Sequence, residues 1–155
     1  FPEDPPASAP VAKRPAELVL HYHAVPARVL DNLCYSPTYT HDAHQLMHQT
    51  RYPSMAITHH YWVPLMLLGW GADPLNSMIT GWRSWDTWVT VNYPEIVITI
   101  MADLPNMNLK PLQGPSTHLG VPDGWAMDTF TRLQRFYGAA AHRGDGVVII
   151  AELRE

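Results

Sequence analysis

Histidine spacing is the feature of this sequence that comes closest to a chemical motif. The chain has nine histidines, and His41, His44 and His48 follow one another at intervals of three and four residues. In an α-helix, at about 100° per residue, their side chains share a sector of about 60° on one face. The His44/His48 pair then has the i, i+4 spacing with which helix-borne histidines chelate a metal ion. The pattern predicts a metal site on this helix face.

A second pair, His21 and His23, lies in a segment whose apolar and polar residues alternate. In a β-strand both side chains project from the same face. Strand and helix together could supply three or four histidines, which suits zinc, copper or iron with one position open for water. The alternative is that these histidines are half-buried polar groups held by structural hydrogen bonds, which is the commoner use of the residue. In that case no cofactor is expected.

Other catalytic signals are weak. No H-E-x-x-H motif occurs, and Ser116 lacks the flanking glycines of a nucleophile elbow. Cys34 is the one cysteine, so neither an internal disulfide nor a four-cysteine zinc site can form. No catalytic residue is assigned, and the sequence favours a protein that is not an enzyme.

The histidines must be positioned by two elements in the first third of the chain. Residues 17–25 alternate as a strand does, and Pro26 ends the pattern. Thr40 can cap a helix that runs from His41 to about Arg51 and is closed by Pro53. The connection between them, residues 27–39, has no clear periodicity.

The remaining elements follow from β-branched runs and from one helical stripe. Residues 88–93 and 96–102 have strong β propensity and predict two strands separated by Pro94. Residues 103–122 contain four prolines and predict an extended loop. Asp123 then opens a helix that Gly144 and Gly146 end, and residues 147–153 predict a last strand. The apolar stripe of this helix contains Met127, Phe130, Leu133, Tyr137 and Ala140.

This order predicts an α+β fold in which an antiparallel or mixed sheet has about two helices packed on one of its faces and long proline-rich loops. Residues 1–15 include five prolines and form an extended N-terminal arm, because proline cannot donate to a helix or a sheet ladder. Residues 16–155 form a single domain.

Composition indicates a protein that is completed by partners. Hydrophobic residues make up 46% of the chain and charged residues 15%, with six tryptophans and seven tyrosines. So little charge leaves apolar surface for an interface. The interface is expected in the uncharged block 52–72, which is too interrupted by prolines to span a membrane but could touch a membrane surface or a membrane protein. Its expected contact residues are Trp62, Leu67, Leu68 and Trp70.

The net charge of −4, without a basic cluster, excludes nucleic acid as a partner. The leading hypothesis is a non-catalytic accessory or structural subunit of a larger, organellar and membrane-associated protein complex. Alternatives are a small histidine-ligated metal enzyme or metal-binding protein, and a secreted ligand-binding domain. The first residue is Phe1 rather than Met, which fits a processed mature chain of an organelle, such as the mitochondrion, or of the secretory route.

Overall fold

The structure, a computed structural model, describes residues 17–49, 51–59, 75–81, 83–86, 89–107 and 124–154. It has the α+β fold predicted from the sequence, built on an antiparallel sheet. The expected N-terminal arm and the expected contact residues in block 52–72 lie outside these ranges.

In the described part of the chain five strands form the sheet, in the order β2-β1-β5-β4-β3, and every neighbouring pair is antiparallel. They are β1 (Glu17–Val25), β2 (Ser54–His59), β3 (Arg83–Asp86), β4 (Val89–Asn92) and β5 (Gly146–Arg154). The two longest strands, β1 and β5, lie in the centre and pair along their whole length, from Glu17 opposite Arg154 to Val25 opposite Gly146. The predicted strands at 17–25, 88–93 and 147–153 are therefore confirmed.

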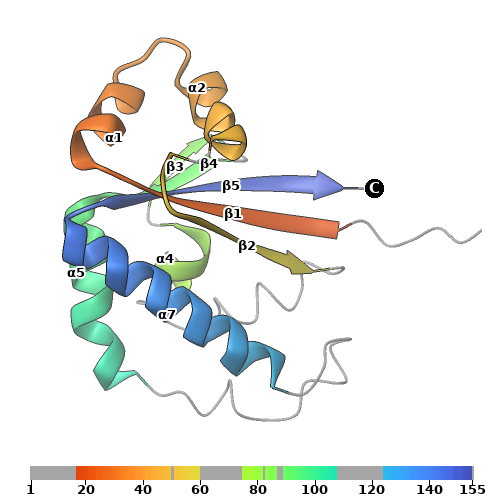
Figure 1. The fold of residues 1–155 in the computed structure, drawn as a ribbon, viewed down its shortest axis with the longest axis vertical. Coiled ribbons are helices and arrows are strands. Elements are labelled where there is room, and N and C mark those ends of the chain that lie inside the picture. The colour runs from red at the N-terminus through yellow and green to blue at the C-terminus, as the bar shows by residue number, and fades with distance from the viewer. Residues whose placement is uncertain are drawn as a thin grey trace, which may run out of the picture.

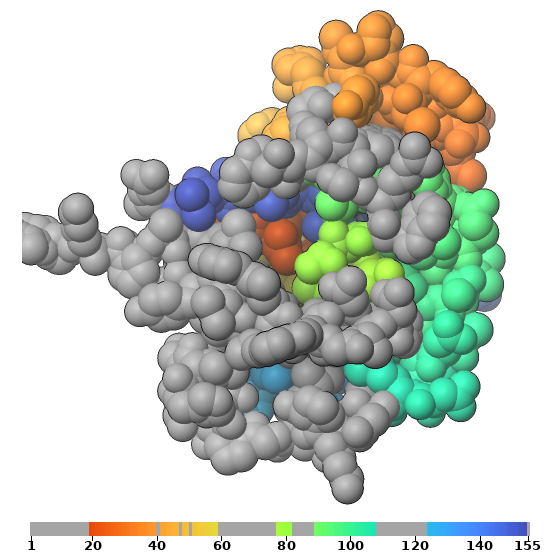
Figure 2. Space-filling model, turned by 180° about the vertical axis from the view of Figure 1, so that it is seen from behind, coloured from red at the N-terminus to blue at the C-terminus, as the bar shows by residue number. Residues whose placement is uncertain are grey.

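Helices cover both faces of this sheet (Figure 1). On one face lie α4 (Leu75–Thr80), α5 (Pro94–Asp103), which continues into the short 3₁₀ turn η3 (Leu104–Asn106), and the long α7 (Trp125–Arg143). On the other face lie α1 (Ala27–Cys34), α2 (Tyr39–Gln45) and the 3₁₀ turn η2 (Leu46–His48). Seen from behind, the orange surface of α1 and α2 stands at one end of the molecule and borders the green-to-teal surface of α5 (Figure 2). The expectation that helices cover only one face is corrected by α1 and α2.

Alternation along the central strands divides the buried residues into two clusters. Leu20, Tyr22 and Ala24 of β1 point toward α7, whereas Val25 belongs to the cluster on the other face, with Leu30 of α1. The close approach of α1 is possible because β5 begins with a glycine. A Cβ atom at Gly146 would come within 2.6 Å of the Leu30 side chain and 3.0 Å of the Asn92 carbonyl oxygen.

The predicted strand at 96–102 is wrong, because this segment is helix α5. Pro94 occupies the start of the helix, where its fixed φ is favourable and its missing N–H costs nothing. Val97 and Ile100, one helical turn apart, are buried, and α5 packs against α7. Burial on a helical stripe has overridden the β propensity of the branched residues.

Helix α7 confirms the predicted stripe. Phe130, Leu133, Tyr137 and Ala140 are buried, and Met127 packs beside them. The helix ends in a Schellman motif at Gly144, whose φ is 76°: the N–H of Gly144 donates to the carbonyl of Ala141, and the N–H of Asp145 donates to that of Ala140. The predicted cap Asp123 lies outside the described residues, and Gly124 is the N-cap.

A buried polar cluster joins α4 to the rest of the fold. The last carbonyls of a helix lack partners within it, and here three of them accept side-chain hydrogen bonds. Tyr22 Oη donates to Ile79 O at 2.7 Å, Tyr137 Oη donates to Met78 O at 2.8 Å, and Asn92 Nδ2 donates to Ser77 O at 2.7 Å. Asn92 Nδ2 also lies 3.0 Å from Tyr137 Oη. These bonds connect β1, β4 and α7 through one short helix. We call them the α4 anchor.

No helix in the described part of the chain is long and apolar enough to cross a membrane.

We predict that Tyr137→Phe lowers the free energy of unfolding by about 1–3 kcal/mol, because the Met78 carbonyl is left buried without its donor. In a thermal melt this loss should appear as a fall of several degrees. Tyr35→Phe is the matched control, since Tyr35 is 86% exposed. Equal melting temperatures for the two variants would show that the α4 anchor does not stabilise the fold.

Candidate functional site

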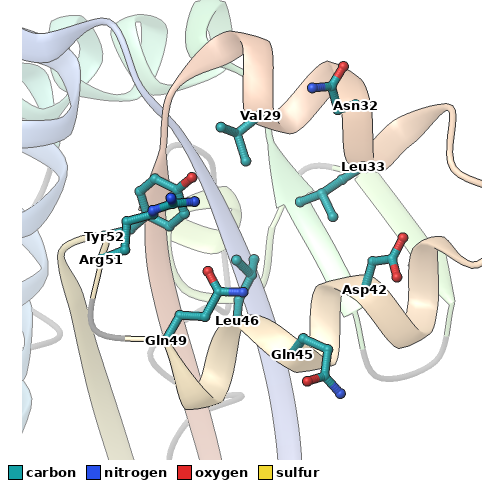
Figure 3. Close-up of a pocket in the computed structure, with 9 residues that line it drawn as sticks. All are labelled: Val29, Asn32, Leu33, Asp42, Gln45, Leu46, Gln49, Arg51 and Tyr52. Carbon is teal, nitrogen blue, oxygen red and sulfur yellow. The ribbon is translucent and has the colours of Figure 1, made fainter.

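A hollow of about 390 Å³ lies between α1 and α2. This volume is within the range of pockets that hold small molecules or single side chains of a partner. The walls are α1 on one side, α2 and η2 on the other, and the chain leading into β2 at one end (Figure 3). The residues that line it are Val29, Asn32, Leu33, Asp42, Gln45, Leu46, Gln49, Arg51 and Tyr52.

The aliphatic part of this lining follows from the way α1 sits on the sheet. Pro26 ends β1, and its carbonyl accepts the N–H of Leu30 at 3.0 Å, which begins the helix. Leu30 is fully buried against the sheet, while Val29 and Leu33 are only half-buried. These two residues are one turn apart and share the neighbouring face, and their side chains point into the hollow (Figure 3).

Asp42 provides a negative charge at one end of the hollow. Its Oδ2 atom accepts hydrogen bonds from Ser36 Oγ at 2.6 Å and Thr38 Oγ1 at 3.2 Å. The two hydroxyls, which belong to the turn between α1 and α2, fix the carboxylate toward α1 (Figure 3). An ionised carboxylate can accept about four hydrogen bonds, so Asp42 keeps capacity for a ligand.

Arg51 provides a positive charge at the other end. Its guanidinium carbon lies 5.7 Å from the centre of the Tyr52 ring, a cation–π distance that holds the side chain at the wall (Figure 3). The guanidinium keeps its planar fork of N–H donors, which matches a carboxylate.

The helix predicted to carry His41, His44 and His48 has other bounds in the structure. The prediction assumed one α-helix over 41–51, but α2 ends at Gln45 and residues 46–48 form a 3₁₀ turn with three residues per turn. His44 therefore lies in α2 and His48 in the 3₁₀ turn, so one regular α-helix does not carry both. His41 and His48 are exposed, and His44 is half-buried.

His21 and His23 share one face of β1, and His21 pairs with a glutamate of the neighbouring strand. His21 Nε2 lies 2.9 Å from Glu152 Oε1 of β5, which also accepts a hydrogen bond from Arg154 Nε at 3.1 Å. The hydrogen bond from His21 is the largest of the effects that hold the pKa of Glu152 below its usual range. Within the described ranges, no three residues of the His, Cys, Asp and Glu types form a group able to hold a metal ion. The metal site stays a prediction from the sequence.

His23 is a buried neutral base. Its side chain is 4% exposed, and Nε2 has no hydrogen-bond partner in the part of the chain that the structure describes. Burial, and secondarily the charge of His21, lower its pKa from 6.5 to about 4. Such a group opposes protonation of the folded protein.

The sequence prediction missed the hollow because it missed α1. The signal was the apolar spacing of Val29, Leu30 and Leu33 after Pro26, which is helical. No local pattern brings Arg51 opposite Asp42, because that depends on how two helices and a turn pack on the sheet.

The chain matches no protein-family model and no curated protein. Its fold is similar to that of YfbM from Escherichia coli, a protein of unknown function whose crystal structure aligns with a TM-score of 0.61. The alignment covers 86% of this chain and 99% of YfbM, with 12% sequence identity. This similarity shows a shared fold and carries no activity.

We predict that the protein loses stability as the pH falls from about 6.5 toward 4, because the unfolded chain protonates His23 before the folded chain does. Above pH 6.5 the residue is neutral in both states and contributes no slope. His23→Leu should flatten the free energy of unfolding between pH 5 and 7, measured by urea titration.

His142→Leu is the control for this measurement, because His142 is exposed on α7 and His23 remains. The window stays above pH 4.5, the ordinary pKa of Glu152. The stability contributed by that lowered pKa is lost only as the pH falls further. A slope that persists in His23→Leu would contradict the assignment to His23.

Proposed function

We propose that this chain is a non-catalytic accessory subunit that holds another protein of a larger complex in the hollow between α1 and α2. The observation that supports the proposal is the lining of the hollow. It combines an aliphatic floor, made by Val29, Leu33 and Leu46, with three side-chain amides and two opposite charges. A partner protein can pack against the aliphatic groups and form hydrogen bonds or ion pairs with the polar ones.

The amides surround the aliphatic floor. Asn32, Gln45 and Gln49 are all exposed, and each amide can donate as well as accept hydrogen bonds. Asn32 and Gln45 point away from the centre of the hollow (Figure 3), so they can contact parts of a partner that extend beyond it. A polypeptide backbone offers both donors and acceptors along its length, which suits this arrangement.

Tyr35 extends the candidate contact surface beyond the hollow. It follows Leu33 by two residues at the end of α1 and is 86% exposed. Exposed tyrosines are enriched in protein interfaces, because they add a large rigid contact area with a polar end. An apolar pocket with an aromatic residue nearby is the usual form of a binding hot spot.

We predict that Val29→Arg releases the chain from its complex, since the new side chain fills the hollow with a positive charge. Native size-exclusion chromatography of extracts from the cells that make the protein is the measurement. Wild type should elute in a particle heavier than the free chain, and Val29→Arg should elute at the mass of the free chain.

Gln134→Arg adds the same side chain at an exposed position of α7, on the opposite face, and should elute like wild type. Leu33→Arg, at the second aliphatic position of the wall, should repeat the result of Val29→Arg. Thermal melts of the purified variants establish that each is folded. The proposal would be overturned if wild type eluted at the mass of the free chain, or if folded Val29→Arg and Leu33→Arg remained in the particle.

A further inference from the structure

The charges of the hollow are separated rather than paired. Asp42 lies in α2 and Arg51 beyond η2, at opposite ends of the hollow (Figure 3). Among the described residues, neither takes part in an ion pair; those present join His21 or Arg154 to Glu152 and Arg143 to Asp145. A positive and a negative group therefore face the same hollow without neutralising each other.

The separation of the two ends limits the ligand. Gln49 follows Asp42 by seven positions, through the end of α2 and the 3₁₀ turn η2. At a rise of about 1.5–2 Å per residue, their Cα atoms lie roughly 10–14 Å apart. In a simple α-amino acid the ammonium and the carboxylate are attached to the same carbon atom, so they cannot reach Asp42 and Arg51 at the same time. A fitting ligand has its two charges separated by a chain.

The wall between the charges defines that chain. Leu46 lies in the middle of one wall, with Val29 and Leu33 opposite (Figure 3). Leu46 is only 3% exposed, whereas Val29 and Leu33 are half-buried, so most of the apolar surface open to a ligand belongs to Val29 and Leu33. An aliphatic spacer that packs against this surface loses water and is stabilised by the hydrophobic effect.

Resting on the function proposed above, the geometry points to a C-terminal lysine of the partner as the group held in the hollow. Its α-carboxylate binds the guanidinium of Arg51, its four-carbon stem lies along this apolar surface, and its ε-ammonium donates to Asp42. An extended lysine with a hydrogen bond of about 3 Å at each end has the required size. Asp42 accepts one hydrogen bond from Ser36 Oγ and one from Thr38 Oγ1 that is shared between its two oxygens, so lone pairs remain for the ammonium.

The test uses the full chain and short synthetic peptides, with binding measured by calorimetry. The probe is N-acetyl-Gly-Gly-Lys with a free carboxylate. One comparison peptide is amidated at its C-terminus, and another has norleucine in place of lysine, so that each lacks one charge. We expect the loss of either charge to weaken binding roughly tenfold or more, as for hydrogen bonds to charged groups.

Variants of the protein assign each charge to its end. Arg51→Gln should bind the free-carboxylate peptide and the amidated peptide equally, and Asp42→Asn should bind the lysine and norleucine peptides equally. This exchange of selectivity would not follow from general damage to the fold. Arg135→Gln, at an exposed position of α7, should behave like wild type.

Free 6-aminohexanoate distinguishes a peptide terminus from a small molecule of the same chemistry, and should bind more weakly than the peptide. Tighter binding of 6-aminohexanoate than of the peptide would overturn the assignment to a protein terminus. Equal binding of all three peptides by wild type, or no binding of any, would overturn the inference altogether. The proposed function would still stand in those cases if Val29→Arg and Leu33→Arg release the chain from its complex.

Discussion

The α4 anchor is the interaction on which the rest of this fold depends. The carbonyls of Met78 and Ile79, at the end of a six-residue helix, would otherwise be buried without a partner among the described residues, a cost of about 1–3 kcal/mol each. The Ser77 carbonyl accepts the N–H of Gly81 at 2.9 Å as well as the amide of Asn92. Their donors Tyr22, Asn92 and Tyr137 come from a central strand, a neighbouring strand and the long helix. Hydrogen bonds demand direction as well as contact, so the cluster fixes how these three elements lie relative to one another.

The α4 anchor lies on one face of the sheet, and the hollow lies on the other face. Tyr22, Phe136 and Tyr137 pack edge to face at centroid distances of 6.1–6.5 Å, and Arg132 of α7 donates to the Ala56 carbonyl of β2. The sheet is thus held from one side. On its other side α1 and α2 rest on Val89, Val91, Val148 and Ile150, and the hollow opens between them.

Some of this could be predicted from the sequence, and the reasons differ by element. Helix α7 has a long apolar stripe of one period, and its burial follows that stripe. Strands β1 and β5 are long segments of β-prone residues, and they are buried on both faces because helices cover both sides of the sheet. The segment of α5 predicts a strand because its branched residues have high β propensity. Pro94, which is favourable at the first position of a helix, is the signal for the helix that forms. The single helix predicted over 41–51 differs from the structure because α2 ends at Gln45 and residues 46–48 form a 3₁₀ turn. The placement of Asp42 and Arg51 at opposite ends of one hollow has no local signal in the sequence, since it arises from tertiary packing.

We propose that α1, α2 and the turn after them form the surface that binds a partner. Hydrogen–deuterium exchange of the chain within its native particle, compared with the isolated chain, is the measurement that tests this proposal. We expect slower amide exchange in the particle over Ala27–Cys34 and Tyr39–Gln45 and unchanged exchange over Trp125–Arg143. Protection confined to Trp125–Arg143, with the exchange of α1 and α2 unchanged, would contradict it.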